Sequence, residues 1–231
     1  MENLTSINDD PVLNWSSIVV RGEQASVFLQ GQLSQDIARV TGGAWTLVLA
    51  PDSVVITSGF ITGSGDEFDL RVPRELGDVA LTRLRRFLLR TRCTIELEAT
   101  DRGPYATLGA RIDAGEPGPD EFAAKLTPHS FGSSFVERTV SFAKGCYTGQ
   151  ELVGRLDARG SKVPWRLVRV AGGNRQSLDE TLRSKGPQGP SGLTSAVVNA
   201  QGVVGLGIAH RTLLDDEGMA QYDDVRIEAI A

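Results

Sequence analysis

Apolar and polar residues alternate in short runs along the first hundred positions of the chain, a pattern typical of β-strands. Such runs cover 17–21, 44–50, 54–62, 67–72 and 93–98. Turn signals rich in glycine and proline separate them, and alternation with a period of two predicts strands that bury one face. The pattern therefore predicts a sheet built from these five strands.

Two helices are expected among these strands. The segment 23–30 (EQASVFLQ) follows Gly22, and a longer helix is expected from Glu75, after Pro73, which suits a first helical turn. Apolar residues recur at helical spacing in the longer helix: Leu76, Val79, Ala80, Leu84, Phe87 and Leu88. The order β-α-β-β-β-α-β predicts an α+β unit with an antiparallel sheet and helices packed on one face.

The second half of the chain has a different texture. Residues 113–140 are rich in glycine and proline and poorly periodic, so we expect a mostly irregular stretch there. After a helix at 149–159, short strands are expected, and they favour a small C-terminal β-barrel. These strands are WRLVRVAG, LTSAVVN, VVGLGIAH and DDVRIEAIA. The expected units are 1–99 (α+β), 100–160 (central segment) and 161–231 (barrel).

Composition excludes several classes of function. The net charge is −5 and the pI is about 5.2, which argues against a phosphate-binding surface and direct nucleic-acid binding. The five arginines of 83–92 are interpreted as the solvated face of a helix that runs into a strand. Two cysteines and two histidines, none clustered, give no metal site. The polar N-terminus shows no signal peptide, and no apolar run approaches the roughly 18–20 residues that span a bilayer, so we expect a cytoplasmic protein without membrane contact.

One cysteine stands in a segment with features of a reactive site. In KGCYTGQELVGRLDARG (144–160), Thr148 and Glu151 fit a capping box, which places Cys146 just before a helix N-terminus. The helix dipole, Lys144 and Arg155 would all lower the thiol pKa, and only a thiolate is a good nucleophile. Cys146 is the candidate catalytic residue. A tight turn with a small packed cysteine is the alternative.

The other cysteine is expected to be inert. Cys93 alternates with Ile95 and Leu97, a pattern that indicates a strand face turned toward a buried core. Burial there would raise its pKa and exclude reagents. We therefore predict that Cys146, and not Cys93, is the reactive thiol.

The sequence also resembles a known family. Residues 144–151 match the K-G-C-Y-x-G-Q-E signature of the YgfZ-type folate-binding family, which is related to the aminomethyltransferase T protein of the glycine cleavage system. Three further stretches resemble that family: WSSIVVRGEQASVFLQGQLSQD, RIDAGEPGPDEF with a following LTP, and LTSAVVNAQGVVGLGIAHR. The resemblance thus covers most of the chain and implies that family's fold, with three parts around a central channel.

The resemblance implies a folate-binding accessory protein that supports iron–sulfur cluster assembly or repair, and that influences tRNA modification through client enzymes. The implied cofactor is tetrahydrofolate or a derivative, and the implied partners are iron–sulfur enzymes or assembly proteins. Trp15 would stack on the pterin while Gln32 or Asp36 supplies polar contacts. An aromatic plug is the alternative role of Trp15, and Tyr147 and Gln150 fit a turn-holding role equally well. The candidate cofactor-binding residues are Trp15, Gln32, Asp36, Lys144, Tyr147, Gln150, Glu151 and Arg155.

Two of the chain's departures from the family pattern bear on its function. It is shorter between Glu98 and Leu108, where longer relatives carry more of the central domain. The paired aspartates of the T protein have no counterpart in APDSVVITSG (50–59), so glycine-cleavage activity is not expected. The alternative function is a non-enzymatic binding module that keeps the fold and has lost folate binding.

Overall fold

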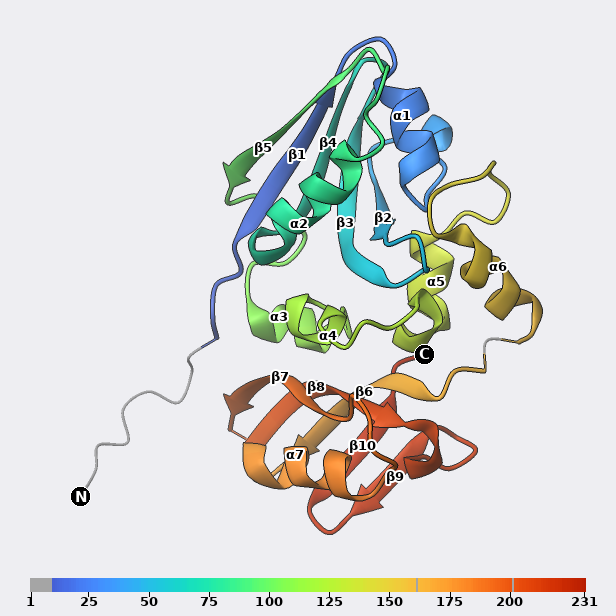
Figure 1. Ribbon diagram of the computed structural model, residues 1–231. Helices are drawn as coiled ribbons and strands as arrows, with labels where there is room; N and C mark the ends of the chain where they lie inside the picture. The colour runs from blue at the N-terminus through green and yellow to red at the C-terminus, as the bar shows by residue number, and fades with distance from the viewer. Residues whose placement is uncertain (1–9, 161, 201) are drawn as a thin grey trace.

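The structure is a computed structural model that describes residues 10–160, 162–200 and 202–231. Two five-stranded antiparallel sheets lie one above the other, with a layer of short helices between them (Figure 1). Most of the N-terminal segment that we examined for a signal peptide, residues 1–9, lies outside the described residues. In the described part of the chain, no helix combines the length and apolar character needed to cross a membrane.

The first sheet has the strand order β2-β3-β4-β1-β5, which confirms the five predicted strands. Strand β1, next to the edge strand β5, pairs antiparallel with both β4 and β5. Two helices pack on this sheet, and their apolar faces join Ile18, Val20 and Leu70 in one buried core. The elements are β1 (Trp15–Arg21), α1 (Ala25–Gln32), β2 (Ala44–Leu49), β3 (Val55–Ser64), β4 (Glu67–Pro73), α2 (Arg74–Arg85) and β5 (Thr94–Thr100).

Two details of this half differ from the prediction. The arginine-rich helix α2 ends at Arg85, and a turn region, not a continuous run, leads into β5. Cys93 stands just before β5 and is half-buried instead of lying in the core. A Cβ atom on Gly22 would lie 2.8 Å from the Cα of Cys93. The backbone at Cys93 is therefore tightly packed, although its side chain is partly exposed to solvent.

The prediction of an irregular stretch over 113–140 is wrong. Four short helical elements stand in or next to it: α3 (Leu108–Asp113), α4 (Pro119–Phe122), η2 (Pro128–Phe131) and α5 (Ser133–Thr139). None exceeds seven residues, which is too short for a helical period to stand out in the sequence. Local signals define their starts instead, such as the Thr107 hydroxyl that accepts from the amide of Ala110. These elements bury Phe122, Phe131 and Phe135 between the two sheets.

The second sheet is open, so the prediction of a closed barrel is wrong. Its strand order is β7-β8-β6-β10-β9, with β7 and β9 as edges. One face packs Leu167 and Leu206 against the short helices, and the other packs Val168 against a helix that the sequence analysis missed. That helix covers the face that barrel closure would otherwise bury. The elements are β6 (Trp165–Gly172), α7 (Arg175–Ser184), β7 (Gly192–Asn199), β8 (Gly202–His210), η3 (Arg211–Leu213), β9 (Met219–Tyr222) and β10 (Val225–Ala229).

Candidate functional site

Lys144, the first residue of the signature segment, is bound to the end of α1. Its ammonium donates to the carbonyl oxygens of Gln30 at 2.7 Å, Leu33 at 2.7 Å and Gln35 at 2.9 Å. The same group lies 5.0 Å from the centre of the Tyr147 ring, within cation–π range. The last carbonyls of a helix have no intrahelical partner, so Lys144 satisfies groups that the fold itself leaves open.

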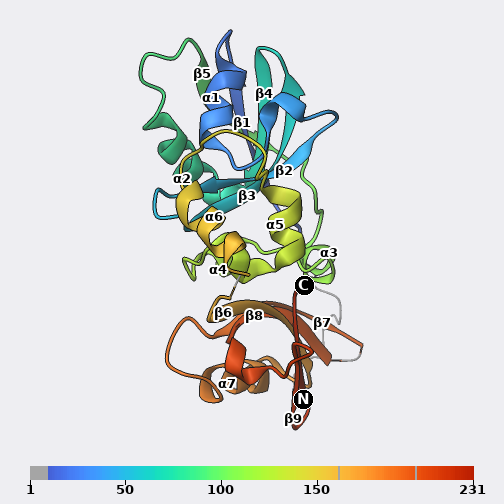
Figure 2. The ribbon, with the colours of Figure 1, turned by 90° about the vertical axis from the view of Figure 1, so that its right-hand side faces the viewer.

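Burial shifts the pKa values of both Lys144 and Tyr147. It lowers the pKa of Lys144 to about 8, against the opposing charge of Asp36, so the ammonium persists at neutral pH. It raises the pKa of Tyr147 to about 12, which keeps the phenol neutral. Both side chains therefore hold the loop that precedes α6 (Gln150–Ala158) against the first half of the chain, beside α1 (Figure 2).

The predicted capping box at the start of α6 is wrong. The N-cap is Gly149, with a φ of 84°, and no side chain caps the helix. A Cβ at this position would lie 2.5 Å from the carbonyl oxygen of Ala50, so only glycine fits where the segment touches β2. The Glu151 carboxylate instead pairs with Arg155 at 2.8 Å on the exposed surface. The Thr148 hydroxyl lies 3.4 Å from the side-chain oxygen of Gln32.

Gln150, Gln32 and Asp36 also make contacts within the protein. The Gln150 side-chain oxygen accepts from the amide of Tyr147 at 3.0 Å, which fixes the turn. The Gln32 oxygen accepts from Arg83 at 2.5 Å, and Asp36 accepts from the Gln30 amide at 3.0 Å. Burial lowers the pKa of Arg83 to about 10, so this guanidinium stays charged at neutral pH. Hydrogen bonds between these polar residues thus connect α1 and α2 to the loop before α6.

Cys146 stands at the exposed part of this loop. Its neighbours Lys144 and Tyr147 are turned into the protein, which leaves the thiol accessible. Cys93 is only half-buried, and burial raises the pKa of its thiol. The structure therefore distinguishes the two cysteines by exposure.

Trp15 lies in a different part of the molecule, at the start of β1. Only 4% of its surface is exposed, and its indole N–H donates to the carbonyl oxygen of Tyr105 at 2.9 Å. The start of β1 is beside α3, whereas the loop before α6 is beside α1 (Figure 1). Trp15 and the signature segment, which the sequence analysis placed in one site, therefore belong to two regions.

Trp15 lines a cavity of about 210 Å³ between the first sheet and helices α3 and α4. A second indole, Trp45, lines it as well and is stacked on Tyr105, with the ring centroids 6.0 Å apart. We call this the Trp15 cavity. The lining residues are Pro11, Leu13, Asn14, Trp15, Trp45, Ser58, Pro73, Glu75, Leu108, Arg111, Glu116, Pro117, Pro119 and Asp120.

Acidic groups line one side of the Trp15 cavity. Glu116 is 2% exposed, accepts from the Ser58 hydroxyl at 3.2 Å and forms an ion pair with Arg138. Burial raises the pKa of Glu116 although Arg138 and Ser58 oppose the shift. Asp120 stands at the exposed rim, and its pKa is raised by burial and by the nearby charge of Glu121.

A buried arginine completes the cavity and links it to the second sheet. Arg111 donates to the carbonyl oxygen of Glu116 at 2.8 Å, to Glu121 at 2.7 Å and to the Ser195 hydroxyl at 2.6 Å. Its Nε–H has no partner among the described residues. Flat aromatic faces, carboxylate acceptors and a free buried donor together suit a planar heteroaromatic ligand that carries N–H groups.

The sequence analysis missed Trp45, Arg111 and Glu116 as site residues. The stretch RIDAGEPGPDEF was noted as a family resemblance, and its charged residues inside an apolar, proline-rich context were the available signal. Among the described residues, no three His, Cys, Asp or Glu side chains lie close enough to bind a metal ion.

Comparisons with known proteins show which fold the chain shares. No family model matches the chain. An uncharacterized protein of Haemophilus influenzae is 24% identical over 253 aligned residues, covering 87% of this chain and 88% of that protein. The crystal structure of glycine cleavage system aminomethyltransferase T from Bartonella henselae matches with a TM-score of 0.58 at 12% identity, covering 94% of this chain and 83% of that one. The protein therefore shares the aminomethyltransferase T fold.

Proposed function

We propose that the protein binds a reduced folate, with the pterin ring in the Trp15 cavity, and that it supports assembly or repair of iron–sulfur clusters in client enzymes. The observation that carries the proposal is the Trp15 cavity itself. It brings two indoles and a set of carboxylates together between the first sheet and the short helices. The fold shared with aminomethyltransferase T, and the family resemblance of the signature segment, support a folate as the ligand.

The residues present fit a pterin. Trp15 and Trp45 offer aromatic surfaces for the flat ring, and Asp120 and Glu116 offer acceptors for its ring N–H and amino groups. The volume of about 210 Å³ is below the roughly 300–1,000 Å³ of ordinary ligand pockets. The bicyclic ring is therefore the part expected inside, with the rest of the folate at the mouth. When bound, a reduced folate that carries a one-carbon substituent would supply that one-carbon unit.

The signature segment has a supporting role in this proposal. Lys144, Tyr147 and Gln150 hold the loop through contacts within the protein, and this arrangement presents Cys146 at the surface. An exposed thiol next to a fixed backbone suits transient contact with a client protein or its cluster. The cysteine acts on the partner, and the Trp15 cavity holds the cofactor.

Tryptophan fluorescence tests the ligand. The chain has three tryptophans, and Trp165 lies in β6 against His210, away from the Trp15 cavity. In a Trp165→Phe background the reporters are Trp15 and Trp45 alone. Anaerobic titration with tetrahydrofolate should quench them with a dissociation constant in the micromolar range or weaker, roughly −8 kcal/mol or less favourable.

A pair of matched variants locates the binding. Asp120→Asn removes a carboxylate at the cavity rim and should weaken tetrahydrofolate binding about tenfold. Asp113→Asn removes a carboxylate from exposed Asp113, at the end of α3 and outside the cavity lining, and should change nothing. Equal effects of the two variants would place the ligand elsewhere.

The small cavity volume favours a second candidate, a binding module of the same fold that has lost folate binding. Calorimetry separates the two. Heat of binding for tetrahydrofolate, with an affinity that is weaker in Asp120→Asn, supports the first. If no heat is released and folate analogues do not compete, the second holds, and the iron–sulfur role must be carried by Cys146 and the surface around it.

A further inference from the structure

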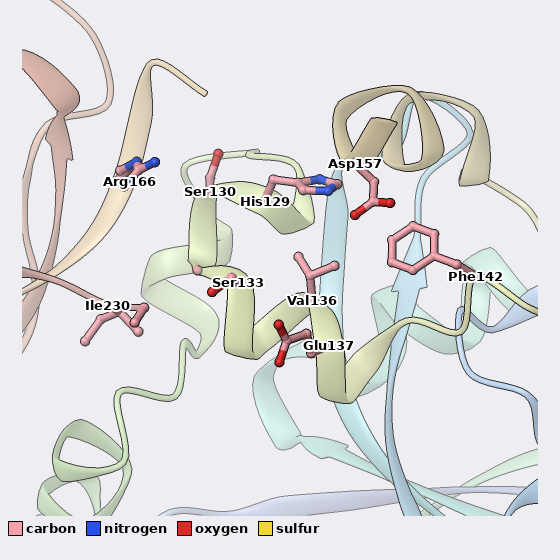
Figure 3. A pocket seen from close by; sticks show the side chains of 11 residues that line it. His129, Ser130, Ser133, Val136, Glu137, Phe142, Asp157, Arg166 and Ile230 are labelled. Atoms are coloured by element: carbon pink, nitrogen blue, oxygen red, sulfur yellow. The ribbon is translucent and has the colours of Figure 1, made fainter. Parts of the chain in front are cut away.

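A second cavity of about 190 Å³ has no part in the proposed folate site. It is lined by residues of η2, α5, α6 and strand β6 (Figure 3). Its walls combine charged, hydroxyl and aromatic side chains. The lining residues are His129, Ser130, Gly132, Ser133, Val136, Glu137, Phe142, Asp157, Arg166, Ile230 and Ala231. We call it the His129 cavity.

His129 is buried in the wall without a hydrogen-bonding partner. It is 6% exposed, and neither Nδ1 nor Nε2 contacts a donor or acceptor among the described residues. Leaving a buried polar atom unpaired costs about 1–3 kcal/mol, so native proteins rarely retain one without a use. The ring is directed across the cavity toward the side of Asp157 (Figure 3). A ligand in the cavity would supply the partner that the protein does not.

The charges around His129 are also unpaired. Neither Asp157 on α6 nor Glu137 on α5 forms an ion pair within the described part of the chain, and the same holds for Arg166 on β6. Arg166 lies at the opposite end of the cavity from Asp157 (Figure 3). Burial lowers the pKa of His129 although Asp157 opposes the shift, so the imidazole is neutral at pH 7. The end of the cavity at His129 therefore carries negative charge.

We propose that the His129 cavity binds a small organic cation, a primary ammonium group on a short apolar chain. An ammonium group has three N–H donors, and the cavity lining offers two kinds of acceptor: the unprotonated nitrogen of His129 and the carboxylates of Asp157 and Glu137. The ring of Phe142 adds a cation–π surface, and Val136 lines the path of the apolar chain.

Other ligand classes fit less well. An anion would face the two carboxylates, and a neutral alcohol would leave them without a counter-charge. A metal ion needs at least three well-placed ligands, and the described residues contain no such group. The ammonium class is the one that can donate to an unpaired imidazole nitrogen and also carries the charge opposite to the carboxylates of the lining.

Histidine side-chain NMR provides the direct test, because the chain has two histidines. The second, His210, contacts Thr212 and packs on Trp165 outside the cavity, so it serves as an internal control. With histidine labelled by nitrogen-15, titration with butylammonium at pH 7.5 should shift the ring nitrogens of His129 and leave those of His210 unchanged. Butanol and butyrate, matched in size, should shift neither.

Variants separate binding from folding. His129→Leu fills the wall with an apolar group, should keep the fold, and should abolish butylammonium binding measured by calorimetry. Asp157→Asn alters an exposed side chain and should weaken binding about tenfold. Glu180→Gln, an exposed carboxylate on α7, should have no effect.

Four outcomes overturn the proposal. The first is an unchanged His129 signal up to butylammonium concentrations that begin to perturb His210. The second is an equal response to butanol, which would show simple filling of an apolar space. The third is a zinc response at His129 with none to butylammonium, which would make the cavity a metal site. Retained butylammonium affinity in both His129→Leu and Asp157→Asn would likewise exclude this cavity.

Discussion

The ammonium of Lys144 lies 2.7 Å from the carbonyl oxygen of Leu33, although 111 residues separate the two in the chain. The carbonyl oxygens of Gln30 and Gln35 also accept hydrogen bonds from this ammonium, so one side chain closes the end of α1. The signature segment thus begins with a residue that joins distant parts of the fold. Its first effect is structural, and the exposure of Cys146 follows from it.

Replacing Lys144 tests this joining role. Lys144→Met should lower the free energy of unfolding by about 2 kcal/mol, because three carbonyl groups lose a charged donor at a partly buried site. Urea unfolding measures the change. Lys162→Met alters an exposed lysine and is the matched control. Equal stability of the two variants would show that the Lys144 contact contributes nothing.

The two cysteines should differ in reactivity. Cys146 is exposed, whereas Cys93 is half-buried and burial raises the pKa of its thiol. A higher pKa leaves less thiolate at neutral pH, and partial burial slows access of reagents. Iodoacetamide at pH 7.5, followed by mass spectrometry, should label Cys146 several-fold faster.

The matching variants sharpen that experiment. Cys93→Ser should leave the fast labelling phase intact, and Cys146→Ser should remove it. Faster labelling of Cys93, or no labelling of Cys146 in the folded protein, would contradict the prediction. In that case Cys146→Ser should also leave iron–sulfur enzyme activities in cells unchanged.

The strands could be read from the sequence because each buries one face. In β4, Phe68, Leu70 and Val72 are buried and alternate with more exposed residues, a period that only a strand produces. Long elements with a repeated period carry enough positions to be recognised. The order of helices and strands in the first half of the chain could therefore be predicted from such elements.

The rest depended on contacts that no local pattern encodes. Helix α7 buries only Leu178 and Leu182, so its sequence is almost wholly polar, and without it the second sheet could be taken for a barrel. Glu116 comes close to Ser58 and Trp45 only after the chain folds back over the first sheet. Likewise, Thr148 loses its capping role because Gly149 takes the left-handed turn that fits against Ala50.

A buried ion pair joins α3 to α4, and breaking it should destabilise the protein. Arg111 and Glu121 are 2.7 Å apart with side chains 5% and 0% exposed. Removing one partner leaves a buried charge, so Arg111→Met should destabilise the protein by about 3–5 kcal/mol. Adding Glu121→Leu to that variant should restore much of the loss. Thermal unfolding measures both, and a double variant no more stable than Arg111→Met would refute the argument.

The same pair should make stability sensitive to acid. Burial alone would raise the pKa of Glu121, but Arg111 and the hydroxyls of Ser195 and Thr194 outweigh it and lower the pKa. A carboxyl with a depressed folded-state pKa stabilises the protein above its unfolded value, near 4.5, and loses that effect as the pH falls through the folded value. As the pH falls into the acid range, the free energy of unfolding should therefore decrease less steeply in Glu121→Gln than in the wild type.

His129 should produce a separate pH dependence at higher pH. Burial lowers its pKa below the ordinary 6.5, against the charge of Asp157. The unfolded chain then binds a proton more readily than the folded one as the pH drops below about 6.5, so folding stability falls in that window and is restored above it. Glu137 and Arg166 are the other charged side chains that line the cavity.

His129→Leu isolates this effect. Melting temperatures measured from pH 7.5 to 5 should fall less steeply in His129→Leu than in the wild type, and at pH 7.5 the variant should be more stable by about 1 kcal/mol, because an unpaired buried imidazole is replaced by an apolar group. His210→Gln, at an imidazole that already contacts Thr212, is the control and should follow the wild-type slope. A variant that gains stability and loses butylammonium binding would show that the chain keeps His129 at a cost in stability. If His129→Leu is instead less stable at pH 7.5, the imidazole has a partner within the fold, and the cavity must be explained by packing alone.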